Sequence, residues 1–313
     1  MKYIFKRFIT LLIALFLISV VVFAAFSVIP SDAAISKLGT EATPERIEAL
    51  RHEMGLDLPL VTRYARWLAG AVRGDFGESY QYGGASVSYL ISRRIGNSAL
   101  LSLLSFIMVI LFSIPLGIFS AKRRSGAGRG TMTAITQITM GIPSFFLGVL
   151  LTYIFSIVLS WFTLGDFVRP EEDFWGACRY LLFPAAAIAL PKIAMTVKFL
   201  TASIRAELHK DYVRTAYSKG LDANGVLYKH VLKNSLIPVI TFLGVVIAEI
   251  VAGSIIVEKV FSVPGIGVLL VTSISNRDYP VVEALVLLIA VFVILINFVV
   301  DMVYIAIDPR VKL

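Results

Sequence analysis

Long apolar runs separated by short polar segments make up most of this chain. Runs of about 20 residues or more with few or no charges occur at residues 8–29, 97–121, 131–162, 181–204, 236–257 and 281–307. About 20 helical residues cross the roughly 30 Å apolar core of a bilayer. The runs lack the two-residue alternation of barrel strands, and backbone amides in lipid must be bonded internally. We therefore expect an all-α polytopic membrane protein with six transmembrane helices.

The overall composition agrees with this prediction. Hydrophobic residues make up 58% of the 313 positions and the mean hydropathy is +0.84, whereas soluble domains are about 45–50% apolar. The chain contains one cysteine, Cys178, so neither an intramolecular disulfide nor a cysteine metal cluster is expected.

The basic residues indicate which way the chain is inserted. With the N-terminus in the cytoplasm, the cytoplasmic segments hold 15 of the 29 Lys and Arg residues and only four acids. This asymmetry obeys the positive-inside rule. It explains the net charge of +8 without nucleic-acid binding, and it places both termini in the cytoplasm.

Four regions follow from these spans. Residues 1–29 form a cytoplasmic N-terminus and the first transmembrane helix, whose run of about 22 residues exceeds the apolar core of a signal peptide. Residues 30–96 form an extracytoplasmic segment with short amphipathic helices. Residues 97–307 form a core of five helices that includes a cytoplasmic loop, 205–235. Residues 308–313 are a cytoplasmic tail.

The extracytoplasmic segment carries helix signals. Thr43, Pro44 and Glu45 supply a capping hydroxyl, a proline at the first helical position and an acid near the positive end of the dipole, and Gly55 is expected to end this helix. A second helix is expected from residue 59 to about residue 72. Its Trp67 favours anchoring at the membrane interface, and contact with a soluble docking protein is the alternative.

The loop at 205–235 is more organised than a topological signal requires. A helix is expected over residues 211–219, Gly220 can break it with a positive φ, and a second helix is expected over 223–234 before Pro238 opens the fifth span. Since both short helices adjoin spans four and five, a soluble partner that moves the loop would tilt those spans.

Several polar residues inside the spans are candidate pathway or subunit-interface residues. A charge at the bilayer centre costs about 2.5–3.5 kcal/mol on insertion scales and must face protein or water. Glu249 could line a pathway or pair with a base of a partner subunit. The remaining candidates are Ser254, Asn297 and Asp301. Pro143, Pro184 and Pro191 are expected to kink the third and fourth spans.

Catalytic signatures are missing from the sequence. It contains no G-x-x-x-x-G-K-[ST] phosphate loop, and its three histidines stand without partners at metal or triad spacing. We therefore expect no catalytic residue, no metal site and no cofactor bound by this chain.

The loop and five further stretches resemble one transporter family. Ala216, Gly220 and His230, followed by Leu-Ile-Pro at 236–238, are similar to the signature loop of ABC importer permeases of the dipeptide, oligopeptide and nickel family. The other stretches are MGLDLPL (54–60), GDFGES (74–79), IVEKVFSVPGIG (256–267), RDYPVV (277–282) and NFVVDMVYIAIDPR (297–310). They occur in the family's order along nearly the whole chain.

The resemblance implies the ABC type I importer fold and a permease subunit that carries peptides by alternating access. The implied partners are a homologous second permease, two ATP-binding subunits that hold ATP and Mg, and an extracytoplasmic substrate-binding protein. The residues implied in coupling to an ATP-binding subunit are Asp211, Tyr212, Arg214, Thr215, Ala216, Lys219, Gly220, Leu221, His230 and Pro238.

Other functions remain open at this point. Nickel chelates, glutathione or sugars could replace peptides as the solute. An ion-gradient-driven transporter would use Glu249 or Asp301 to carry protons, but no inverted repeat is visible and the hinged loop would be unexplained. A membrane-embedded enzyme would need a catalytic set that the sequence does not contain.

Overall fold

The structure is a computed structural model that describes residues 2–28, 43–53, 57–123 and 127–307. These residues are almost entirely helical, and their only β-pairing is an isolated antiparallel bridge between Glu78 and Ser86. The chain divides into two compact units, Met1–Ser98 with Pro264–Leu295 and Ala99–Val263 with Ile296–Leu313. Helices α5 (Val87–Lys122) and α13 (Tyr279–Ile307) each contribute to both units.

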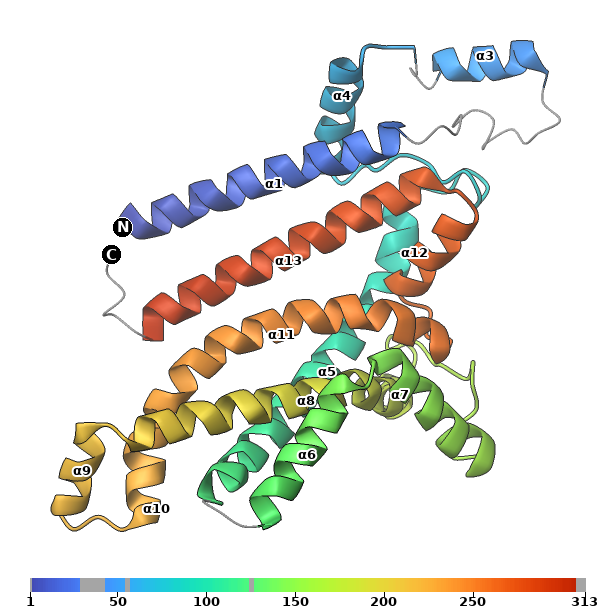
Figure 1. Cartoon of the computed structure of the whole chain (residues 1–313). Helices are drawn as coiled ribbons and strands as arrows, with labels where there is room; N and C mark the ends of the chain where they lie inside the picture. The colour runs from blue at the N-terminus through green and yellow to red at the C-terminus, as the bar shows by residue number, and fades with distance from the viewer. Residues whose placement is uncertain (1, 29–42, 54–56, 124–126, 308–313) are drawn as a thin grey trace. The chain divides into compact units, whose positions relative to one another are not determined.

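The first unit contains α1 (Lys2–Val28), α3 (Pro44–Glu53), α4 (Leu60–Val72) and α12 (Ile266–Ser275). Helix α4 lies beside the end of α1 (Figure 1). The Tyr64 hydroxyl bonds to Ser19 Oγ at 2.8 Å, and its ring lies edge-on to Phe23. Trp67 also contacts Phe23. These aromatic side chains therefore fasten the second short helix to the first span.

The second unit contains α6 (Ala127–Gly141), α7 (Ser144–Leu151), the π-helix η1 (Thr152–Val158) and α8 (Phe174–Leu208). After α8 come α9 (Asp211–Ser218), α10 (Ala223–Val226), the π-helix η2 (Leu227–Val231) and α11 (Leu232–Val260). The core between α8 and α11 includes Leu181, Ile188, Val246 and Ile250. Phe199 stacks on Phe242 at a centroid distance of 4.6 Å.

Five helices are long and apolar enough to cross a membrane, and α6 with α7 supplies a sixth crossing if this bent pair forms one span. This pair corresponds to the run at residues 131–162. The expected kink at Pro143 is a break with a 95° bend between the two helices. Proline lacks the amide hydrogen and its ring clashes with the preceding turn, so α7 starts anew directly after Pro143.

Other proline positions differ from the expectations. Pro238 was expected to open the fifth span, but it lies inside α11, which is continuous with α10 and η2 from Ala223 to Val260. Helix α8 is not interrupted at Pro184 or Pro191, and the kinks expected at these two prolines stay a prediction.

The structure describes where the helices of the segment expected at residues 30–96 begin, but not every helix end. The first short helix begins at Pro44 as expected, whereas its expected stop at Gly55 lies outside the described residues. Helix α5 begins at Val87, so the expected boundary at residue 96 falls within a helix.

Candidate functional site

The segment between α8 and α11, residues 209–231, forms a bent connection that we call the elbow (Figure 1). Helix α9 ends in a Schellman motif: Gly220 N–H donates to the Tyr217 carbonyl at 2.9 Å and Leu221 N–H donates to the Ala216 carbonyl at 3.4 Å. Gly220 has a φ of +83°, which glycine adopts without the steric cost of a Cβ. The expected glycine break between two helices is confirmed.

The second half of the elbow starts with a capped turn. Asp222 Oδ1 accepts the Gly225 N–H at 3.0 Å, which satisfies one of the free amides at the start of α10. The following turns are η2, which leads into α11 without interruption. Because the helix is continuous, a displacement of α10 is transmitted directly to α11.

One face of the elbow is buried against the ends of three long helices. Val213 and Ala216 of α9 and Val226 of α10 share a cluster with side chains of α5, α8 and α11. These partners are Ile118 and Ala121 of α5, Leu200 and Ile204 of α8, and Val239 of α11. The sequence suggested levers on two spans, whereas the packing adds the end of α5 as a third.

Polar contacts reinforce the same junction. Lys122 Nζ donates to Asn224 Oδ1 at 3.0 Å and lies 4.8 Å from the Tyr228 ring centre. The guanidinium of Arg205 donates to the Ser120 carbonyl at 3.1 Å. The Tyr212 hydroxyl donates to Glu207 at 2.7 Å. Partial burial is the largest cause that raises the pKa of Tyr212, and the Glu207 carboxylate acts in the same direction. The elbow and the ends of α5 and α8 are therefore joined by polar as well as apolar contacts.

The opposite face of the elbow is exposed and polar. The exposed coupling candidates are Asp211, Arg214, Thr215, Lys219, Gly220 and His230. Arg214 lies 3.8 Å from Asp211, but both side chains are more than 80% exposed, so this pair contributes little to stability. Ala216 is buried, Tyr212 and Leu221 are half-buried, and Pro238 is exposed on α11 beyond the elbow.

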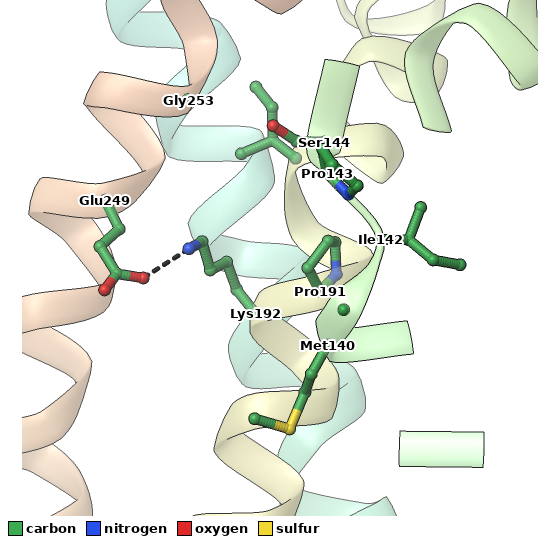
Figure 2. Close-up of a pocket in the computed structure, with 10 residues that line it drawn as sticks. Met140, Ile142, Pro143, Ser144, Pro191, Lys192, Glu249 and Gly253 are labelled. Atoms are coloured by element: carbon green, nitrogen blue, oxygen red, sulfur yellow. Dashed lines mark hydrogen bonds and ion pairs between the residues drawn. The ribbon is translucent and has the colours of Figure 1, made fainter. Parts of the chain in front are cut away.

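A second candidate site lies about midway along α8 and α11, where Lys192 and Glu249 form an ion pair (Figure 2). Glu249 therefore has a basic partner within its own chain. Sequence reasoning noted Lys192 only as a charge within the fourth span. Lys192 and Glu249 are 57 positions apart. The sequence therefore indicates only a lysine within an apolar run and does not reveal its partner.

The remaining intramembrane candidates are scattered. Ser254 is buried and donates to the Val251 carbonyl at 2.8 Å, whereas Asn297 is exposed and Asp301 is half-buried. The structure does not bring Asn297 or Asp301 into the cavity beside Glu249. Their suggested pathway role stays a prediction. The described residues contain no group of three or more His, Cys, Asp and Glu that could hold a metal ion.

Sequence reasoning missed a buried latch in the first unit. Asp278 is fully buried and accepts hydrogen bonds from Ser79 Oγ at 2.5 Å and from the Tyr80 N–H at 3.0 Å. Burial raises the pKa of Tyr80 to about 12, and the nearby carboxylates of Glu283 and Asp278 act in the same direction. The latch joins the loop before α5 to the start of α13. Ser79 and Asp278 lie within GDFGES and RDYPVV, two of the stretches that carried the resemblance.

We expect Asp278→Ala to lower the unfolding free energy by about 2–4 kcal/mol, because it leaves the buried Ser79 hydroxyl and the half-buried Tyr80 N–H without an acceptor. This effect is measured by thermal unfolding of the purified protein, which is monitored as the loss of monodisperse material. Asp278→Asn retains one acceptor oxygen and should lose less than half as much. Equal unfolding temperatures for Asp278→Ala and the wild type would show that the latch is unimportant.

Comparisons with known proteins show the family to which the chain belongs. The profile described as binding-protein-dependent transport system inner membrane component matches residues 113–313, and the profile of its N-terminal part matches residues 1–84. The oligopeptide transport system permease protein AppB of Bacillus subtilis is 34% identical over 312 residues, 99% of each chain. A putative peptide permease protein of Brucella ovis is 34% identical over 316 residues, covering 100% of this chain and 99% of its own. The glutathione transport system permease protein GsiC of Escherichia coli K12 is 36% identical over 313 residues, with the same coverage.

Proposed function

Because the chain belongs to the family of binding-protein-dependent transport system inner membrane components, we propose that it is the permease subunit of an ATP-driven importer of peptides. It is a multi-pass membrane protein with several apolar helices. The proposed mechanism is alternating access, in which the membrane helices expose a pathway first to one side and then to the other.

The observation that carries the proposed mechanism is the packing of the elbow. Its buried face contacts the ends of α5, α8 and α11, while its polar face is open to a partner. We propose that an ATP-binding subunit docks on the polar face and that its closure on nucleotide moves these three ends together. ATP and Mg would then be bound and hydrolysed in separate subunits.

The proposed assembly contains four kinds of component besides the lipid. This permease pairs with a homologous permease, two ATP-binding subunits dock from the cytoplasm, and a binding protein delivers solute from the other side. This arrangement places the N- and C-termini in the cytoplasm of a prokaryotic cell. The positive-inside charge pattern supports it.

Peptides are the favoured solute because two relatives matched over nearly their full lengths are peptide permeases by name. Glutathione is the second candidate, since GsiC is 36% identical over the whole chain. Glutathione is itself a small peptide, so one pathway chemistry serves both.

Uptake by the complex reconstituted in liposomes tests this proposal. We expect labelled di- or tripeptide to accumulate with binding protein and ATP, and vanadate to stop it. Accumulation that follows a proton gradient and is indifferent to ATP would contradict the proposal and favour a secondary transporter.

The link between α5 and the elbow gives a separate prediction. Lys122→Ala removes the contacts to Asn224 and Tyr228, each worth about 0.5–1 kcal/mol at an exposed site. We expect transport to fall by about twofold to fivefold at unchanged assembly. Lys229→Ala, at an exposed position of η2 beside Tyr228, is the control. Equal uptake by the two variants would refute a role for this link.

A further inference from the structure

The Lys192–Glu249 pair borders a cavity of about 220 Å³ in the second unit (Figure 2). The broken segment between α6 and α7, residues 140–144, forms one wall. Helix α8 contributes Ile188, Pro191 and Lys192, and α11 contributes Glu249 and Gly253. In Figure 2 the two charged side chains extend toward each other from α8 and α11.

Three features of this place indicate that water or a polar solute enters it. The side chains of Lys192 and Glu249 are 22% and 37% exposed, and charges at this depth in a helix cannot face lipid cheaply. The helix break beside them leaves terminal backbone groups of α6 and α7 without helical partners. Such backbone is tolerated in a membrane only where it is covered by protein or lines a wet cavity.

The pair leaves much of its hydrogen-bonding capacity unused. An ammonium group has three donors and a carboxylate has about four acceptor positions. Within the described part of the chain, the Lys192 ammonium and the Glu249 carboxylate have only each other as side-chain partners. Both groups can therefore accept a further polar partner from the cavity.

Stability alone does not explain the pair. The contact between α8 and α11 is already formed by buried apolar side chains such as Ile188 and Ile250 and by the stacked rings of Phe199 and Phe242. A desolvated ion pair is often no more stabilising than apolar residues of the same volume. A charged pair at this position is therefore better explained by what it binds.

We propose that Lys192 and Glu249 form a binding subsite for the charged main-chain ends of a short peptide in the translocation pathway. The peptide ammonium pairs with Glu249 and its carboxylate pairs with Lys192, so the solute replaces each residue's partner. A zwitterion makes this exchange without changing the net charge inside the membrane. This inference rests on the proposed function and specifies the solute chemistry.

The volume of the cavity limits the length of the peptide that the subsite can bind. Its 220 Å³ is below the roughly 300 Å³ at which drug-sized ligand sites begin. A dipeptide can place both ends between the two side chains. A longer extended chain, at about 3.3–3.6 Å per residue, can engage one end only.

The test uses a thiol introduced by Ser144→Cys in a Cys178→Ser background, because Ser144 lines the cavity and Cys178 is the only native cysteine. The assembled complex with binding protein and ATP is treated with a small neutral thiol reagent. We expect labelling at this position, slowed about tenfold by Ala-Ala. N-acetyl-Ala-Ala-amide, which has no charged ends, should slow labelling less than twofold.

Glu249→Gln in the same background provides the matched variant. It should still be labelled without peptide and lose the protection by Ala-Ala. No labelling, no protection, or equal protection by the blocked dipeptide would overturn the subsite. If the complex imports Ala-Ala but Ala-Ala does not slow the labelling, only the subsite is overturned. If the complex shows no ATP-driven uptake of any peptide, the proposed function is overturned.

Discussion

Gly220→Val is expected to reduce ATP-driven uptake at least tenfold while the protein still inserts and assembles. Gly220 has a φ of +83°, a conformation that costs a side-chain-bearing residue about 1–2 kcal/mol and a β-branched one more. Apart from its two chain neighbours, a Cβ at this position would meet no atom within 4 Å. The penalty therefore acts on the backbone turn between α9 and α10, and relieving it changes the angle of the elbow.

The comparison variant for this prediction is Gly220→Asn, because asparagine tolerates the left-handed region better than other non-glycine residues. Uptake by Gly220→Asn should lie between the wild type and Gly220→Val, with similar amounts of assembled complex for all three. Wild-type uptake by Gly220→Val would show that the geometry of the elbow is irrelevant to transport.

Removing one member of the Lys192–Glu249 pair is the second large effect that we expect. Lys192→Met leaves a carboxylate, and Glu249→Gln leaves an ammonium, without its partner in the middle of a span. Breaking a buried pair costs about 3–5 kcal/mol. Because these side chains are partly exposed, we expect each single variant to lower the unfolding free energy by about 1–3 kcal/mol. The measurement is unfolding of the complex in nanodiscs.

The double variant Lys192→Met with Glu249→Leu separates stability from transport. It removes both charges, so most of the stability lost in the single variants should return. Uptake of Ala-Ala should stay at least tenfold below the wild type, because the subsite is gone. Additive losses of stability would show that the two charges do not act as a pair, and recovery of uptake would show that transport does not need them.

Features that depend on residues close together in the sequence could be predicted from the sequence. Apolar runs marked the spans because burial in lipid constrains every position of a crossing helix. The elbow was predictable because a glycine between two helix-forming segments supports a Schellman turn at Gly220. The start of α3 at Pro44 followed from local capping chemistry.

Features that depend on three-dimensional packing were not predictable in this way. The contact between Ser79 and Asp278 joins residues 199 positions apart, and Lys192 meets Glu249 only because α8 packs on α11. The sequence could not show whether a proline breaks a helix. Pro143 lies at the break between α6 and α7, whereas Pro238 lies within the uninterrupted helix α11.

Crosslinking from the elbow tests the central claim most directly. A thiol introduced by Ser218→Cys in the Cys178→Ser background lies on the exposed face of α9, and it carries a short photoactivatable reagent. Ser275→Cys, exposed at the end of α12, is the control. In complexes that hydrolyse ATP, the account predicts an adduct between the Ser218 position and the ATP-binding subunit, with none from the Ser275 position. An active complex without the Ser218 adduct would contradict coupling through the elbow.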